Sequence, residues 1–425
     1  MLFNKLFINS IFKSTKTFSA LFSVFMLLVT VSFASFIIKN KVPDQNSETC
    51  ETLNDVQKVS AQNAEKYKTE ESQPEKEELR AVWIPYLDLC IQNFSEKNFK
   101  NHYIEILDKA EKLKLNTVFV QVRPSSDALY PSKIFPWSHI LTGKQGVDPG
   151  FDPLKFMVEE THARNIKFHA WVVPMKISLN KNLCETNPCV IWKRDNPDKF
   201  QKYVIKSEEY ACYDPQYEEV RKLITDGVKE IVEGYDVDGI NFDDYFYPAN
   251  NLWVDGKQKA SSETYIDCEK REENINLLIS EVYRTVKSVK KDVLFGICPQ
   301  GNFDNLKRGG VNIDTWIKNE GYVDYLCPEI YTNSENPVLP FEKAVSDWKK
   351  RCTNEKIKLY AGLGLYKTGT SQYDNGSWTK SNDIIKNQIE FLRREDYDGF
   401  SLYSSVYLDQ DENQGEVLNI MKVLN

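Results

Sequence analysis

The sequence predicts an α/β fold, a (β/α)8 barrel with long βα loops, on three observations. From Leu79 onward, short β-like runs alternate with amphipathic helical stretches, and there are eight such runs. Strand–helix alternation indicates parallel strands joined by crossover helices. Polar residues gather where the runs end, which is the end of a TIM barrel that carries the active site. A doubly wound open sheet is the alternative that the same alternation allows.

The elements follow one another in a regular order. The β-like runs are Leu79–Leu87, Thr117–Val122, Lys167–Pro174, Gly239–Asp244, Leu294–Pro299, Val323–Tyr331, Leu359–Tyr366 and Gly399–Ser405. Between the runs the apolar residues recur at helical spacing, as from Phe99 to Leu113. Asp152-Pro153 and Asp214-Pro215 predict helix starts, an N-cap followed by proline at the first helical position.

Alternation within each strand predicts which side chains face the barrel axis. Val118, Val120 and Val122 suit the helix layer, which turns Gln121 and Arg123 inward. In the fourth run the same parity turns Asp243 inward and Asp244 towards the following loop. The predicted axial ring consists of Arg123, His169, Trp171, Asn241, Asp243, Gln300, Glu329, Tyr331, Tyr366 and Tyr403.

The chemistry of this ring favours carbohydrate. The chain has only four His, no GxSxG, no HExxH and no Gly-rich phosphate loop, and a net charge of −8 argues against nucleic acid as a partner. Sugars stack on Trp and Tyr, and glycosidic cleavage needs two carboxyl groups. We therefore expect Asp243 to act as nucleophile or base, with Glu329 or Asp244 as the acid. No cofactor or metal is expected.

Each candidate also has a structural interpretation. Asp243 and Asp244 are also residue types that cap a following loop or bind a structural cation. Glu329 has Arg123 as a possible ion-pair partner, since a buried unpaired charge is costly. His169 alone is typical of a hydrogen-bonded wall residue, and Trp171 suits either a sugar platform or barrel packing.

Several segments together resemble one known family. They are Gln121 to Ser132, Pro136-Trp137-Ser138, Leu141-Thr142-Gly143, Asp152-Pro153-Leu154, His169-Ala170-Trp171 and Val237 to Pro248. This order of motifs is similar to the bacterial glycosyl hydrolase-like family 10. The resemblance implies a (β/α)8 barrel acting on cell-surface glycans, peptidoglycan strands among them.

The family motifs map onto named positions of this chain. The resemblance places the fourth-strand aspartate motif on Asp243 and Asp244, and the second-strand motif on Arg123 and Asp127. Glu329 departs from the family pattern, which commonly has an amide there. Tyr245 stands where chitinase-like barrels carry a Glu. We include Asp127 and Tyr245 among the substrate-binding candidates.

The chain divides into three parts. Residues 1–41 read as a signal peptide or N-terminal membrane anchor, because basic residues precede an uncharged run at residues 17–38. Residues 42–78 read as a flexible polar linker, and residues 79–425 as the catalytic domain. This arrangement predicts an extracytoplasmic protein, secreted or tethered to the outer face of the membrane. Among nine Cys, Cys184 and Cys189 share one loop and suit a disulfide.

Three functions fit these observations. The first is a glycoside hydrolase acting on a cell-wall polysaccharide, most of all peptidoglycan-type strands. The second is a non-catalytic glycan-binding barrel of the cell wall. The third is a metal-dependent barrel enzyme in which Asp243, Asp244 and Glu329 hold Mg²⁺ or Ca²⁺.

Overall fold

The computed structural model describes residues 77–91, 93–178, 183–206, 211–248, 253–254, 257–258 and 268–425. The predicted export segment at 1–41 and nearly all of the predicted linker at 42–78 lie outside these residues. The described residues all belong to one compact unit. None of the helices described is both long and apolar enough to cross a membrane.

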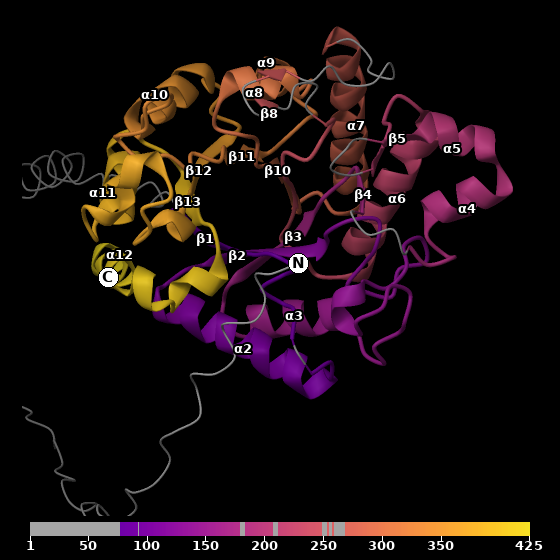
Figure 1. Cartoon of the computed structure of the whole chain (residues 1–425), viewed down its shortest axis with the longest axis horizontal. Coiled ribbons are helices and arrows are strands. Elements are labelled where there is room, and N and C mark those ends of the chain that lie inside the picture. The colour runs from indigo at the N-terminus through magenta and orange to yellow at the C-terminus, as the bar shows by residue number, and fades with distance from the viewer. Residues whose placement is uncertain are drawn as a thin grey trace, which may run out of the picture. The chain divides into compact units, whose positions relative to one another are not determined.

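Eight parallel strands close into a barrel in the order β1-β13-β12-β11-β10-β7-β3-β2 (Figure 1). The predicted (β/α)8 barrel is therefore confirmed, and the pairing of β1 with β13 excludes the open sheet. The barrel strands are β1 (Leu79–Ile84), β2 (Thr117–Arg123), β3 (Lys167–Val172), β7 (Gly239–Phe242), β10 (Leu294–Ile297), β11 (Tyr325–Leu326), β12 (Lys358–Leu363) and β13 (Gly399–Leu402). Each lies within one of the eight predicted runs or differs from it by one residue.

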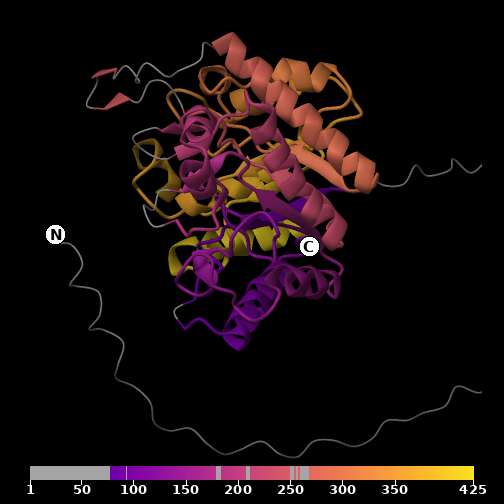
Figure 2. The ribbon, with the colours of Figure 1, turned by 90° about the vertical axis from the view of Figure 1, so that its right-hand side faces the viewer.

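Helices follow the strands and surround the barrel (Figure 1). They are α2 (Glu96–Lys112), α3 (Pro153–His162), α6 (Glu218–Gly234), α7 (Cys268–Val289), α8 (Phe303–Arg308), α9 (Ile313–Lys318), α10 (Phe341–Arg351), α11 (Ile384–Arg394) and α12 (Gln414–Leu424). Figure 2 shows the long helices α6 and α7 lying side by side on the outside of the barrel.

One of the two predicted helix starts is confirmed and the other is wrong. The carboxylate of Asp152 accepts a hydrogen bond from the N–H of Lys155 and caps α3, with Pro153 in the first turn. Asp214 caps no helix, because α6 begins only at Glu218. Its carboxylate instead accepts the N–H of Gln216, which forms a local turn.

The barrel strands separate two apolar layers, as the parity argument predicts. Val118, Val120 and Val122 belong to the large cluster between strands and helices. A smaller cluster fills the barrel interior, and its buried members are Leu79, Ala81, Trp83, Phe119, Trp171, Val173, Cys298, Tyr325, Cys327 and Tyr360. The interior is therefore a packed aromatic core, and ligands have access only at its end.

A second layer, absent from the predicted elements, is inserted between β3 and α6. It contains α4 (Pro188–Asp195), α5 (Pro197–Tyr203) and a three-stranded sheet in the order β4-β6-β5 (Lys176–Ser178, Ala211–Tyr213, Val204–Lys206). The expected disulfide in this region does not form, since Cys184 and Cys189 are both free thiols. A short hairpin, β8 (Trp253–Val254) with β9 (Lys257–Gln258), follows β7.

Candidate active site

A cleft of about 870 Å³ opens at the carboxyl ends of the barrel strands. Residues that follow or end all eight strands contribute to its wall, from Tyr86 after β1 to Tyr403 after β13. The predicted site residues that line it are Trp171, Asp243, Asp244, Tyr245, Gln300, Glu329, Tyr331, Tyr366 and Tyr403. The barrel topology therefore brings together side chains that lie more than 200 residues apart in sequence.

Asp243 lies at the floor of this cleft, one residue beyond the end of β7. Its carboxylate accepts hydrogen bonds from the indole N–H of Trp171 (2.9 Å) and from the backbone N–H of Tyr245 (3.3 Å). The residue is 2% exposed. Burial, and next the negative charge of Asp244, raise the pKa of Asp243 to about 7. Asp243 is therefore divided between its two protonation states near neutral pH.

Asp244 lines the same cleft, so the parity prediction that it faces the following loop is wrong. The reason is that β7 ends at Phe242, and alternation no longer governs the residues beyond it. The side chain of Gln300 forms a hydrogen bond with the Asp244 carboxyl group. Burial nevertheless raises the pKa of Asp244, against the opposing effect of that hydrogen bond.

Glu329 is the third carboxyl group of the cleft and stands three residues beyond the end of β11. Its backbone bridges to Gln300 on one side and to Gly362 on the other, which fixes it between two strand ends. Burial raises the pKa of Glu329 well above its usual range, and the charges of Asp244 and Asp243 raise it further. The described residues supply no hydrogen-bond donor to its carboxyl group, and this surrounding favours the protonated form.

Tyrosines form one flank of the cleft. The ring of Tyr331 lies 5.9 Å from that of Tyr366 and 5.7 Å from that of Tyr403, between centroids. Tyr245, after β7, also lines the cleft and is 44% exposed. The sequence prediction that these tyrosines lie at the site agrees with their place in the cleft lining, and their role in binding sugar stays a prediction.

Two predicted residues face the axis but lie below the cleft. His169 and Asn241 are buried and do not line the cavity. Nδ1 of His169 is 3.0 Å from the hydroxyl of Tyr325, which also lies 3.0 Å from Oδ1 of Asn241. Burial lowers the pKa of His169 to about 4, so the imidazole is neutral. These residues form a polar layer beneath the floor, and His169 is the wall residue that the sequence suggested.

Arg123 and Asp127 also lie outside the cleft lining. Arg123 lies near Tyr130, Phe135 and Tyr213, which belong to the cluster between strands and helices, so the expectation that it faces the axis is wrong. The pairing of β2 with β3 shifts register between Gln121 and Arg123. Its guanidinium packs 4.5 Å from the ring of Phe135, and the expected ion pair with Glu329 is absent from the described structure. Asp127 accepts a hydrogen bond from the side-chain N–H of Gln145 (3.2 Å). Both residues hold the long loop between β2 and α3.

The cleft also contains residues that the sequence patterns did not indicate. Two lysines line it, Lys176 from the inserted sheet and Lys367 from the segment after β12. Asn302 and Asn305 complete the wall beside Gln300. No periodic signal marks these positions, because they lie in connections and outside the barrel strands.

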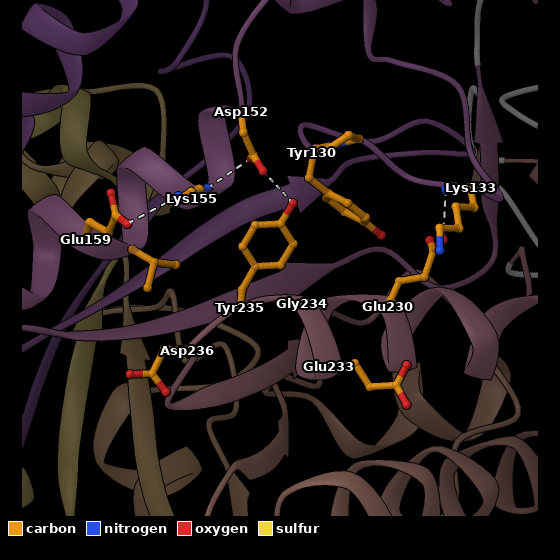
Figure 3. Close-up of a pocket in the computed structure, with 12 residues that line it drawn as sticks. Tyr130, Lys133, Asp152, Lys155, Glu159, Glu230, Glu233, Gly234, Tyr235 and Asp236 are labelled. Atoms are coloured by element: carbon orange, nitrogen blue, oxygen red, sulfur yellow. Dashed lines mark hydrogen bonds and ion pairs between the residues drawn. The ribbon is translucent and has the colours of Figure 1, made fainter.

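A second hollow of about 520 Å³ lies on the outer wall, between α3 and α6 (Figure 3). Several of its polar groups are paired with one another. The hydroxyl of Tyr235 donates to Asp152 (2.9 Å), and the backbone N–H of Lys133 donates to Glu230 (2.8 Å). It contains none of the predicted site residues, so the cleft at the barrel mouth is the candidate active site. No metal-binding group of three or more His, Cys, Asp or Glu side chains occurs among the described residues.

Comparison with known proteins adds sequence relatives. A family model described as glycosyl hydrolase-like 10 matches residues 78–380. Glycosyl hydrolase YngK of Bacillus subtilis is 37% identical over 349 residues, which cover 75% of this chain and 66% of that protein. The chain thus spans just under two thirds of the length of YngK. Glycosyl hydrolase DigH of Escherichia coli K12 is 31% identical over 375 residues, covering 80% and 83%.

Solved structures share the architecture at much lower identity. The glycoside hydrolase domain of PgaB (BpsB) from Bordetella bronchiseptica superposes with a TM-score of 0.56 at 12% identity, covering 81% of this chain and 98% of that one. The catalytic domain of β-amylase from Paenibacillus polymyxa gives a TM-score of 0.53 at 12% identity, covering 80% and 96%. At this identity the likeness shows the fold alone.

Proposed function

The chain belongs to the glycosyl hydrolase-like 10 family, and from that premise we propose that it is a glycosidase that hydrolyses bacterial cell-surface glycan, in particular peptidoglycan-type strands. Family and barrel together support a glycosidase of unspecified linkage. The proposal adds the substrate and a mechanism based on two carboxyl groups.

The observation that carries the proposal is the unequal environment of two buried carboxyl groups in one cleft. Asp243 accepts two hydrogen bonds, which favour its charged form. Glu329 has no such donor among the described residues and faces two other carboxyl groups, which favours its protonated form. Glycosidic cleavage requires one carboxyl group in each state.

The different environments of Asp243 and Glu329 assign each a role in the cleavage. Glu329 gives its proton to the glycosidic oxygen that leaves. Asp243, as a carboxylate, either attacks the anomeric carbon or activates the attacking water. Asp244 lies beside them and keeps a negative field on the cleft floor, which stabilises the positive charge that develops on the sugar ring in the transition state.

The shape of the site supports a polymeric substrate. The cleft lies at the barrel mouth, and both tyrosines and side-chain amides line it. Such a site accepts several sugar units, stacks them on rings and hydrogen-bonds their hydroxyl and acetamido groups. The predicted export segment at 1–41 is consistent with a glycan outside the cytoplasm.

Incubation of the full chain with three glycans tests the proposal: intact peptidoglycan, peptide-free strands and de-N-acetylated strands. Mass analysis of the products is expected to show shortened strands with new reducing ends. Asp243→Asn is the matched variant, since it keeps the shape of the side chain and removes its charge. We expect it to bind glycan and to release no product.

Two outcomes would contradict the proposal. A wild-type chain that binds glycan but cleaves none of the three substrates would indicate a glycan-binding module. Cleavage by Asp243→Asn at the wild-type rate would place the chemistry elsewhere.

A further inference from the structure

Lys176 reaches the cleft from outside the barrel. It begins β4, the strand of the inserted sheet that pairs with β6, where it lies opposite Cys212. The backbone on either side is held, since the N–H of Tyr213 donates to the carbonyl of Met175 (2.8 Å) and the N–H of Ser126 donates to that of Ile177 (3.0 Å). The position of Lys176 is therefore fixed by two separate parts of the chain.

The ammonium group of Lys176 lies over the segment that holds Asp243. Its Nζ is 4.8 Å from the centroid of the Tyr245 ring. The backbone N–H of the same Tyr245 donates to Oδ1 of Asp243. Lys176 and Asp243 both line the cleft, and the ammonium attracts the Asp243 carboxylate. A cation placed on this ring favours negative charge at Asp243 and stabilises the turn that positions it.

The other groups around Asp243 do not bring positive charge to it, as Lys176 does. Asp244, Glu329 and Tyr403 are acidic groups whose charged forms repel a carboxylate at Asp243. Trp171 donates a hydrogen bond but carries no charge. Lys367, the second lysine of the cleft, lies 4.8 Å from the ring of Tyr373 and is not among the groups that act on Asp243. Of the two lysines that line the described cleft, Lys176 is therefore the one whose charge favours the ionised form of Asp243.

We propose that Lys176 is a positioning residue for the reaction, whose ammonium group, held over the ring of Tyr245, favours negative charge on the neighbouring Asp243. This inference rests on the proposed function. It gives the inserted sheet a task, which is to bring a cation to the part of the cleft that holds Asp243. Lys176 does not touch the reacting bond in this account and acts through Asp243 and Tyr245.

The pH dependence of kcat/KM tests this role. Removal of the cation in Lys176→Met is expected to move the acid limb of the profile to higher pH by about one unit, the size expected for loss of one nearby charge. Lys176→Arg is expected to restore the wild-type limb. The matched control is Lys193→Met, which removes an exposed lysine over the ring of Phe200 in the same inserted layer (5.9 Å), away from the cleft. It is expected to leave the profile unchanged.

Titration of the carboxyl groups in the absence of substrate separates this inference from the proposed function. With ¹³C-labelled Asp, the NMR signal that disappears in Asp243→Asn is assigned to Asp243, and its midpoint is expected to rise in Lys176→Met. An unchanged midpoint would overturn the inference even if the wild type cleaves glycan. A shifted midpoint in a chain that cleaves no glycan would support the electrostatic role of Lys176 and contradict the proposed function. If Lys176→Met does not fold, Lys176→Gln and Lys176→Arg provide the same comparison.

Discussion

Trp171→Phe is expected to change the pH dependence of the enzyme, because it removes one of the two donors to Asp243. The indole N–H lies 2.9 Å from Oδ2 of a carboxyl group that is 2% exposed. A hydrogen bond to a charged group contributes about 1.5–3 kcal/mol. Since one pKa unit corresponds to about 1.4 kcal/mol, the pKa of Asp243 should rise by about one to two units.

The size of the expected change in kcat/KM follows from the wild-type pKa of Asp243, which is about 7. At pH 6 roughly one tenth of Asp243 is ionised in the wild type, and an increase of one unit reduces this to about one hundredth. We therefore expect kcat/KM at pH 6 to fall about tenfold from this cause, with a smaller loss at pH 8. The assay is the release of reducing ends from soluble glycan between pH 5 and pH 9.

Trp83→Phe is the matched control. The indole N–H of Trp83 donates to the hydroxyl of Ser401 (2.9 Å) in the same inner cluster, but it does not contact the cleft carboxyl groups. Its acid limb should stay in place. A loss in Trp171→Phe that is equal at every pH would refute the electrostatic reasoning, and would indicate that Trp171 acts only as a surface for sugar.

Further predictions concern roles, stability and metals. Burial raises the pKa of Asp243 from 3.8 to about 7. The free energy of unfolding of the wild type should therefore fall by up to roughly 4 kcal/mol as pH rises between these values. Asp243→Asn lacks this loss, so its melting temperature should exceed that of the wild type at pH 8 and match it near pH 4. Glu329→Gln should lose about 10²–10⁴-fold in rate on natural glycan but much less on an aryl glycoside whose leaving group needs no proton, and an equal loss on both would contradict its role as acid. Asp152→Ala removes the cap of α3 and the acceptor of the Tyr235 hydroxyl, and should cost about 1–2 kcal/mol in urea unfolding with unchanged activity. Treatment with EDTA should leave the rate unchanged, and a loss restored by Mg²⁺ or Ca²⁺ would support the metal-dependent alternative.

Strand periodicity was sufficient to predict the barrel and the position of Asp243. Each βα unit buries both faces of its strand and one face of its helix, so a short apolar run followed by a helical apolar stripe repeats along the chain and shows the elements directly. Parity then identifies which side chains face the axis and which face the helices, and it holds for Val118, Val120 and Val122.

Parity does not give the height of a residue along the axis. His169 and Asn241 face inward as predicted, yet they lie one layer beneath the floor of the cleft. In that layer the ring of Tyr325 fills the space that a side chain on Gly296 would occupy. Where a strand ends or its pairing shifts register, parity no longer predicts which way a side chain faces. This is why the predicted directions of Asp244 and Arg123 are wrong.

Neither strand periodicity nor parity identifies site residues that lie in the segments between the barrel strands. Lys176 belongs to an inserted sheet whose three short strands carry too few residues for a period to be recognised. Its place beside Tyr245 depends on long-range pairing with β6. Sequence alone therefore predicts the carboxyl groups of the site but not the cation that accompanies them.

Cleavage of glycan in ¹⁸O-labelled water tests the central claim most directly. A two-carboxylate hydrolase adds water across the glycosidic bond, so the wild type should place one ¹⁸O at the anomeric carbon of every new reducing end, and Asp243→Asn should give no product. Products that contain no ¹⁸O, or strands that remain intact with the wild type, would contradict it.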